Sequence, residues 1–230
     1  IDTIADNAFE KCINLKELHL DGNKLESINC EELGNFTNLE KLYLYKNKLT
    51  AIDGKAFQTL EKLSILRLEE NQIKTTAENA FDNCINLKEL VFSGNKLKII
   101  NGEEFKKLVN LNLLGLHNNK IEAIAENAFE NCTNLEQLGL YGNKLTTIKE
   151  KTFQKLENLS HLRLDENQIE TIAENAFEKC IYLKELNLKG NKLTTIDSNT
   201  FKNLKTLTKL RLSNNKIKTI DDNAFENCTN

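Results

Sequence analysis

Apolar and polar residues alternate in a short segment that recurs along the whole chain. In the copy at 135–140, leucines alternate with other residues, as in a half-buried β-strand, and Asn143 follows. Nine copies of this pattern, 24 residues apart, cover the 230 residues. The repeated asparagines are Asn23, Asn47, Asn71, Asn95, Asn119, Asn143, Asn167, Asn191 and Asn215. A period of this length predicts a solenoid, in which each copy forms one coil.

The spacing also predicts how successive coils pack. One strand per coil, joined by short connections, requires parallel strands stacked about 4.8 Å apart. We expect the Asn143 side chain to point inward and to bond the backbone of its own and the next coil, which satisfies polar groups at the turn. A phenylalanine column, interrupted by Leu33, is predicted to pack as a spine on the opposite, convex side. The column consists of Phe9, Phe57, Phe81, Phe105, Phe129, Phe153, Phe177, Phe201 and Phe225.

The motifs LEQLGLYGNKLTTI and LSHLRLDENQIETI resemble those of the leucine-rich-repeat family, in its 24-residue typical subclass. The segments AFENCTNL and AFDNCINL are similar to cysteine-bearing repeats of some bacterial and protist surface proteins. The resemblance implies an α/β solenoid, a right-handed horseshoe with a parallel β-sheet on its concave face and short 3-10 or irregular segments on its convex face. It also implies a binding module without catalytic residues in the solenoid.

We expect one solenoid over residues 1–230. Because Ile1 aligns with Leu25, and Asn230 with Asn38, the chain begins and ends between strands, and no polar cap is recognisable. The sequence therefore predicts a fragment that lacks its terminal caps.

Four of the six cysteines recur with a period of 48 residues. Cys84, Cys132, Cys180 and Cys228 alternate with leucines, and Cys12 and Phe36 occupy the same site in the first two units. In the second unit, Leu33 stands at the phenylalanine position and Phe36 at the position that holds cysteine or leucine in later units. A large and a smaller residue therefore exchange places there, with the total volume kept.

The thiols of this column are predicted to be buried apolar fillers. Cysteines two coils apart lie about 10 Å from each other, too far for a disulfide or a shared zinc ion. Cys30 lies outside the column and is expected to be more exposed, and pairing with Cys12 stays open. Unpaired thiols favour a reducing compartment, whereas the resemblance favours the cell surface or the extracellular space, which leaves a cytoplasmic location open.

Composition and motifs exclude several functions. The net charge of −3 and the interspersed charges argue against a nucleic-acid partner, and no apolar run is long enough to insert into a membrane. No phosphate loop, nucleophile elbow or paired-histidine metal motif is present. Cys132 is expected inside and His161 outside, so they form no catalytic pair. We therefore predict no enzyme, no cofactor and no metal site.

Residue variety concentrates on the outward positions of the predicted strands. All three arginines, all three histidines and three of the four tyrosines lie there. Gly115 and Gly139 predict a shallow hollow at mid-sheet, and exposed Ile65, Val91 and Leu113 an apolar strip beside the tyrosines. The candidate ligand-binding residues are Tyr43, Tyr45, Ile65, Arg67, Val91, Leu113, His117, Tyr141, His161, Arg163 and Arg211.

Two functions are compatible with this pattern. The first is a recognition or adhesion module that binds a protein or peptide on the concave face, with glycan recognition through the tyrosines as a weaker variant. The alternative is a structural element that assembles with itself through uncapped ends, in a fibre or an extracellular layer. Duplication of a 48-residue pair explains the repeated arginines without a ligand, and aromatic side chains also stabilise neighbouring strands.

Overall fold

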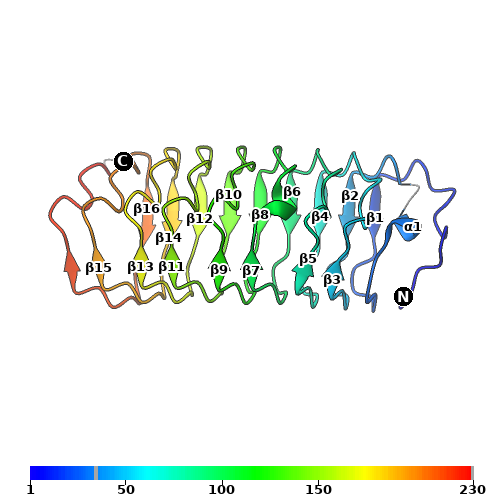
Figure 1. The fold of residues 1–230 in the computed structure, drawn as a ribbon, viewed down its shortest axis with the longest axis horizontal. Coiled ribbons are helices and arrows are strands. Elements are labelled where there is room, and N and C mark those ends of the chain that lie inside the picture. The colour runs from blue at the N-terminus through cyan, green and yellow to red at the C-terminus, as the bar shows by residue number, and fades with distance from the viewer. Residues whose placement is uncertain (34–35, 229–230) are drawn as a thin grey trace.

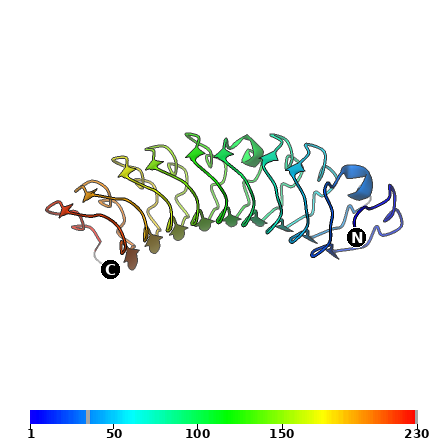
Figure 2. The same cartoon turned by 90° about the horizontal axis from the view of Figure 1, so that it is seen from below.

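The computed structural model describes residues 1–33 and 36–228, except for the side chain of Cys30. Nine three-residue strands form one parallel sheet, in chain order and with every pair offset by 24 residues, as in Leu114 opposite Leu138. The strands are β1 (Glu17–His19), β2 (Lys41–Tyr43), β4 (Ile65–Arg67), β6 (Glu89–Val91), β8 (Leu113–Gly115), β10 (Gln137–Gly139), β12 (His161–Arg163), β14 (Glu185–Asn187) and β16 (Lys209–Arg211). The sheet follows the inner edge of an arc, so the predicted solenoid with a concave sheet is confirmed (Figures 1 and 2).

Eight further strands, of two residues each, lie on the outer edge of the arc (Figure 2). They are β3 (Ala51–Ile52), β5 (Thr75–Thr76), β7 (Ile99–Ile100), β9 (Ala123–Ile124), β11 (Thr147–Ile148), β13 (Thr171–Ile172), β15 (Thr195–Ile196) and β17 (Thr219–Ile220). They pair only in twos, β3 with β5, β7 with β9, β11 with β13 and β15 with β17. Because the inner strands keep the spacing of one continuous sheet, the outer edge of the curve is longer, and its coils separate at alternate junctions.

Regular helix is confined to α1 (Cys30–Leu33) and the 3-10 turn η1 (Glu103–Phe105) among the described residues. The short outer strands accompany the predicted short 3-10 and irregular segments and are a feature that the prediction did not name. Their alternation has the 48-residue period of the cysteine column, so the duplicated pair is also a structural unit.

The repeated asparagines hold successive coils together. The Asn143 amide nitrogen donates to the carbonyl oxygens of Leu116 and Leu140, at 3.0 and 2.9 Å. Its amide oxygen accepts from the backbone N–H of Ile121 at 3.0 Å. The bridge was predicted, but it reaches the preceding coil instead of the following one. The ladder is buried from Asn47 to Asn191, where water cannot replace these bonds.

A second row of asparagines, which the sequence analysis missed, precedes the inner strands. Each of these amide nitrogens donates to the backbone carbonyl oxygen 25 residues earlier, as Asn110 does to Ile85 at 2.8 Å. The same bond is made by Asn38, Asn86, Asn134 and Asn158. These residues are exposed, so the inner sheet is bridged by asparagine amides at both ends of its strands.

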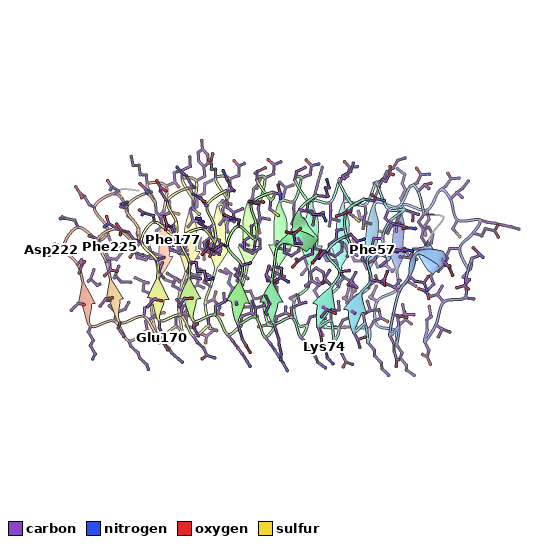
Figure 3. All side chains as sticks on the ribbon, in the orientation of Figure 1. Phe57, Lys74, Glu170, Phe177, Asp222 and Phe225 are labelled. Atoms are coloured by element: carbon purple, nitrogen blue, oxygen red, sulfur yellow. The ribbon has the colours of Figure 1, made fainter. Side chains whose placement is uncertain are left out.

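The phenylalanine spine is confirmed. Phe129 and Phe153 stack with ring centroids 6.4 Å apart, and other neighbours repeat the contact along one row (Figure 3). At the exchanged site, Leu33 and Phe36 are both fully buried, and the Phe36 ring lies 5.1 Å from that of Phe9. The core is therefore filled at this site, although the leucine and the phenylalanine have exchanged positions.

The cysteine column is buried in its central part. Cys84, Cys132 and Cys180 are fully buried, and burial raises their pKa values to about 12. Cys12 is exposed, so the prediction of a buried filler is wrong there, because Cys12 lies in the first described coil and is packed on one side only. The predicted exposure and pairing of Cys30 concern a side chain that lies outside the described part of the structure.

Candidate functional site

A hollow of about 280 Å³ lies on the concave face, over strands β4 to β12. Its floor contains Leu114 and Leu138, whose side chains are buried, and the backbone of Gly115 and Gly139. A β-carbon on Gly139 would lie 3.4 Å from Nδ1 of His117. The missing side chain of Gly139 therefore leaves the surface open at mid-sheet, where the sequence predicted a hollow.

Three side chains from successive coils stack along one wall of the hollow. The rings of His117 and Tyr141 are nearly parallel, with centroids 4.3 Å apart and an interplanar angle of 12°. The guanidinium carbon of Arg163 lies 3.8 Å from the centroid of Tyr141, a cation–π contact. Asp165 accepts two hydrogen bonds from Arg163, at 3.1 and 2.7 Å. The wall is therefore an ordered aromatic surface with a fixed cation.

The stack also sets the charge of the wall. Burial lowers the pKa of His117, and the positive charge of Arg163 adds to this effect, so the imidazole favours its neutral form. The hydrogen bonds that Arg163 donates to Asp165 raise the pKa of Arg163, which keeps the guanidinium charged. Because the His117 ring is neutral and the Arg163 guanidinium is already paired with Asp165, this wall is better suited to a ligand with apolar and hydrogen-bonding groups than to a free anion.

Arg67 lies on the opposite side of the hollow and is also paired with carboxylates. Its guanidinium donates to Glu69 at 3.1 Å and to Glu89 at 2.9 Å. Burial raises the pKa of Glu69, against the effect of Arg67. The hollow therefore has an apolar floor between two neutralised arginine pairs.

Seven of the eleven predicted residues line this hollow. They are Arg67, Val91, Leu113, His117, Tyr141, His161 and Arg163. Val91 is only 3% exposed, so its assignment to an exposed strip is wrong. The physical reason is Gly115, because a β-carbon there would lie 2.7 Å from Cγ1 of Val91, which occupies the space the glycine leaves. Gln137 also lines the hollow. The sequence did not predict it, because a glutamine on an exposed strand position is common and does not indicate a binding site.

The other four predicted residues lie elsewhere on the concave face. Tyr43 stacks on His19, with ring centroids 4.3 Å apart. Tyr45 borders a neighbouring depression of about 470 Å³, and its hydrogen bond to Asp21 raises its pKa. Ile65 is half-buried on β4. Arg211, on β16, pairs with a glutamate of β14 and does not line the hollow.

The concave face does not bring His161 and Cys132 together as a catalytic pair. Nδ1 of His161 lies 2.8 Å from Oγ of Ser160, whereas the thiol of Cys132 is fully buried, so the two do not meet. Within residues 1–33 and 36–228, no group of three or more histidine, cysteine or acidic side chains is arranged to hold a metal ion. In the same ranges, no helix has the length and apolar character needed to cross a membrane.

The repeat geometry agrees with a known family profile. The family described as "BspA type Leucine rich repeat region (6 copies)" matches residues 2–119 and 98–230. The chain belongs to this family. No curated protein matches this BspA-type chain.

Several solved structures are similar to this BspA-type solenoid. A chain of the TLR13–ssRNA13 complex is 29% identical with a TM-score of 0.84, over 91% of this chain and 30% of that one. A chain of the Drosophila Toll–Spätzle complex is 24% identical with a TM-score of 0.93, over 99% of this chain and 31% of that one, and this likeness shows the fold alone. A chain in an octameric complex of latrophilin 3, Unc5D and the leucine-rich repeats of FLRT2 is 27% identical with a TM-score of 0.73. The match covers 95% of this chain and 73% of that one.

The chain thus spans about a third of the length of the first two structures. Because one of the similar structures is a complex with single-stranded RNA, the fold does not exclude nucleic acid, and the absence of such a partner stays a prediction.

Proposed function

We propose that this chain is a non-catalytic recognition module that binds a protein or peptide on its concave face. The observation that carries the proposal is the ordered stack of His117, Tyr141 and Arg163 beside the apolar hollow. Tyrosine and arginine are the residue types most enriched at energetic centres of interfaces. Because neighbouring coils already hold these side chains, binding loses less conformational entropy.

Electrostatics favours a protein over a nucleic acid. The arginines around the hollow, Arg67 and Arg163, are paired with carboxylates of the same face. A phosphate backbone needs surplus positive charge, which this face does not offer. The similar structure with latrophilin 3, Unc5D and FLRT2 is a protein–protein complex, which also supports a protein ligand. Glycan binding through Tyr43, Tyr45 and Tyr141 is the weaker alternative.

The test selects ligands from a peptide display library on the immobilised 230-residue protein. Gly139→Leu places a side chain in the hollow, and we expect the selected peptides to bind this variant at least about tenfold more weakly, a change of about 1.4 kcal/mol. Ser213→Leu adds the same side chain to the concave face beyond the hollow and serves as the matched control. Selected peptides that bind Gly139→Leu and the unaltered chain equally would place recognition elsewhere.

Sedimentation velocity tests the alternative of a self-assembling structural element. A recognition module is expected to keep one sedimentation coefficient as concentration rises. Polymers that grow with concentration, and that persist in Gly139→Leu, would favour assembly through the ends instead.

We infer that the module acts at the cell surface or outside the cell. The resemblance of its AFxxC units to those of surface proteins supports this location. The conflict with unpaired thiols is reduced, because Cys84, Cys132 and Cys180 are fully buried and their raised pKa values suppress the reactive thiolate.

A further inference from the structure

The outer edge of the solenoid has a cavity of about 430 Å³ between β5 and β7, where two pairs of short strands separate. Its lining includes Lys74, Lys96, Lys98, Thr76 and Ile99. The cavity lies across the solenoid from the concave hollow and shares none of its lining residues. A volume of this size accommodates a small molecule.

The three lysines of this cavity have no carboxylate partner among the described residues. Lys74 and Lys98 form no ion pair with any residue that the structure describes. Nζ of Lys96 donates to Oε1 of Gln72 at 2.9 Å, a neutral partner. Glu104 is the one acidic residue of the lining, and its carboxylate accepts the backbone N–H of Gly102 at 3.0 Å. Three lysines against one carboxylate leave a surplus of positive charge in the cavity.

The duplicated units provide a matched comparison. Glu122 and Glu170 lie 48 and 96 residues after Lys74, at the same position of the repeat. They pair with Lys144 at 3.8 Å and with Lys192 at 3.7 Å. Figure 3 shows Lys74 and Glu170 along the same edge of the solenoid. At the β5–β7 junction, a lysine therefore stands where Glu122 and Glu170 pair with a lysine in two later units.

Other lining residues also differ from their counterparts in the later units. Lys98 takes the place of Thr146 and Thr194, which adds a third cation. Ile99 takes the place of Thr147 and Thr195 and is 57% exposed, which adds an apolar wall. Lys74, Lys98 and Ile99 thus place two cations and an exposed apolar residue together at the β5–β7 junction.

Within the described chain, backbone donors are unused at this junction, as they are at the later junctions between strand pairs. Where outer strands pair, the N–H groups of Lys74 and Ala77 donate to the preceding coil, at 2.9 and 3.0 Å. The equivalent N–H groups of Lys98 and Asn101, which border the cavity, have no acceptor among the described residues. Unbonded backbone N–H groups are donors that an anion in the cavity could use.

We propose that this cavity binds a small organic oxyanion, a carboxylate or a phosphate monoester on a short apolar body. The oxyanion replaces the missing glutamate and is bound by Lys74, Lys96 and Lys98. The free N–H groups of the junction donate to its remaining oxygen atoms. The apolar body packs against Ile99, which explains why that residue differs from the threonines of the later units.

Phenyl phosphate and benzoate are the probes for this site. Each is titrated into the full 230-residue chain, labelled with ¹⁵N, and amide signals are followed by NMR. We expect saturable shifts at Thr76, Lys98, Ile99 and Asn101, and no comparable shifts at the concave hollow. The probe that binds more tightly identifies the head group, and either order supports an oxyanion site.

Lys74→Glu restores the ion pair of the later units, so the variant is expected to fold. We expect it to weaken binding of both probes at least tenfold. Lys218→Glu makes the same charge change at the same repeat position in the last coil, away from the cavity, and is expected to bind as the unaltered chain does. Absence of saturable shifts, or equal weakening by both substitutions, would overturn the proposal.

Discussion

Arg163 lies over the ring of Tyr141, with its guanidinium carbon 3.8 Å from the ring centroid, and so joins two neighbouring coils. Asp165 holds the guanidinium from the other side through two hydrogen bonds. Residues from β12 and from the segment after β10 thus form one rigid element on the concave face. The stability of this element and its ionisation are both open to measurement.

We expect Tyr141 and Arg163 to be energetically coupled. A double-mutant cycle with Tyr141→Ala and Arg163→Ala should give a coupling energy of about 0.5–2 kcal/mol, the range of cation–π contacts from exposed to desolvated sites. Urea unfolding of the four proteins measures it. The same cycle between Tyr141 and Arg211, which are not in contact, is expected to give none. Equal couplings in both cycles would contradict the assignment.

His117 is expected to titrate below the ordinary histidine value of 6.5, because burial and Arg163 both disfavour its charged form. The unfolded chain then binds more protons than the folded one. The contribution of His117 to stability is therefore complete above that ordinary pKa, and it is lost as pH falls from there through the folded-state pKa.

NMR titration of the His117 ring signals measures this pKa directly. Arg163→Gln removes one cause of the shift and is expected to move the pKa upward. A pKa that stays unchanged in this variant would show that burial alone lowers it.

The asparagine ladder should dominate local stability. Asn143→Ala leaves the backbone N–H of Ile121 and two carbonyl groups without this partner in a buried site, and we expect a loss of about 2–5 kcal/mol. Urea unfolding measures the change. Asn215→Ala removes equivalent bonds where water has access, so its cost should be smaller. A larger loss for Asn215→Ala would argue against burial as the cause.

The thiols should differ sharply in reactivity. Under native conditions, iodoacetamide is expected to modify Cys12 and to leave Cys84, Cys132 and Cys180 intact, because burial raises their pKa values to about 12. Peptide mapping by mass spectrometry gives the site of each adduct. All six cysteines should react after unfolding in urea, and modification of Cys132 in the folded chain would contradict its burial.

Much of the fold was predictable because the period itself sets the register. Once Leu114 and Leu138 occupy the same place in adjacent coils, their strands can pair only in parallel, and Asn143 must follow at the turn. The concave face and its hollow were predictable for the same reason, since Gly115 and Gly139 fall on adjacent outward positions. The period does not describe how side chains of different coils arrange themselves, which is why Val91 was assigned incorrectly.

The sequence by itself determined the coil length, the parallel sheet, the buried asparagines and leucines, and the face on which residues vary, because each follows from one unit repeated in register. Only the tertiary structure decided features that depend on curvature and on contacts between coils. The arc lengthens the outer edge and separates its strands into pairs, which opens the cavity beside Lys74. Across the inner sheet, close approach of adjacent coils stacks Tyr141 between His117 and Arg163.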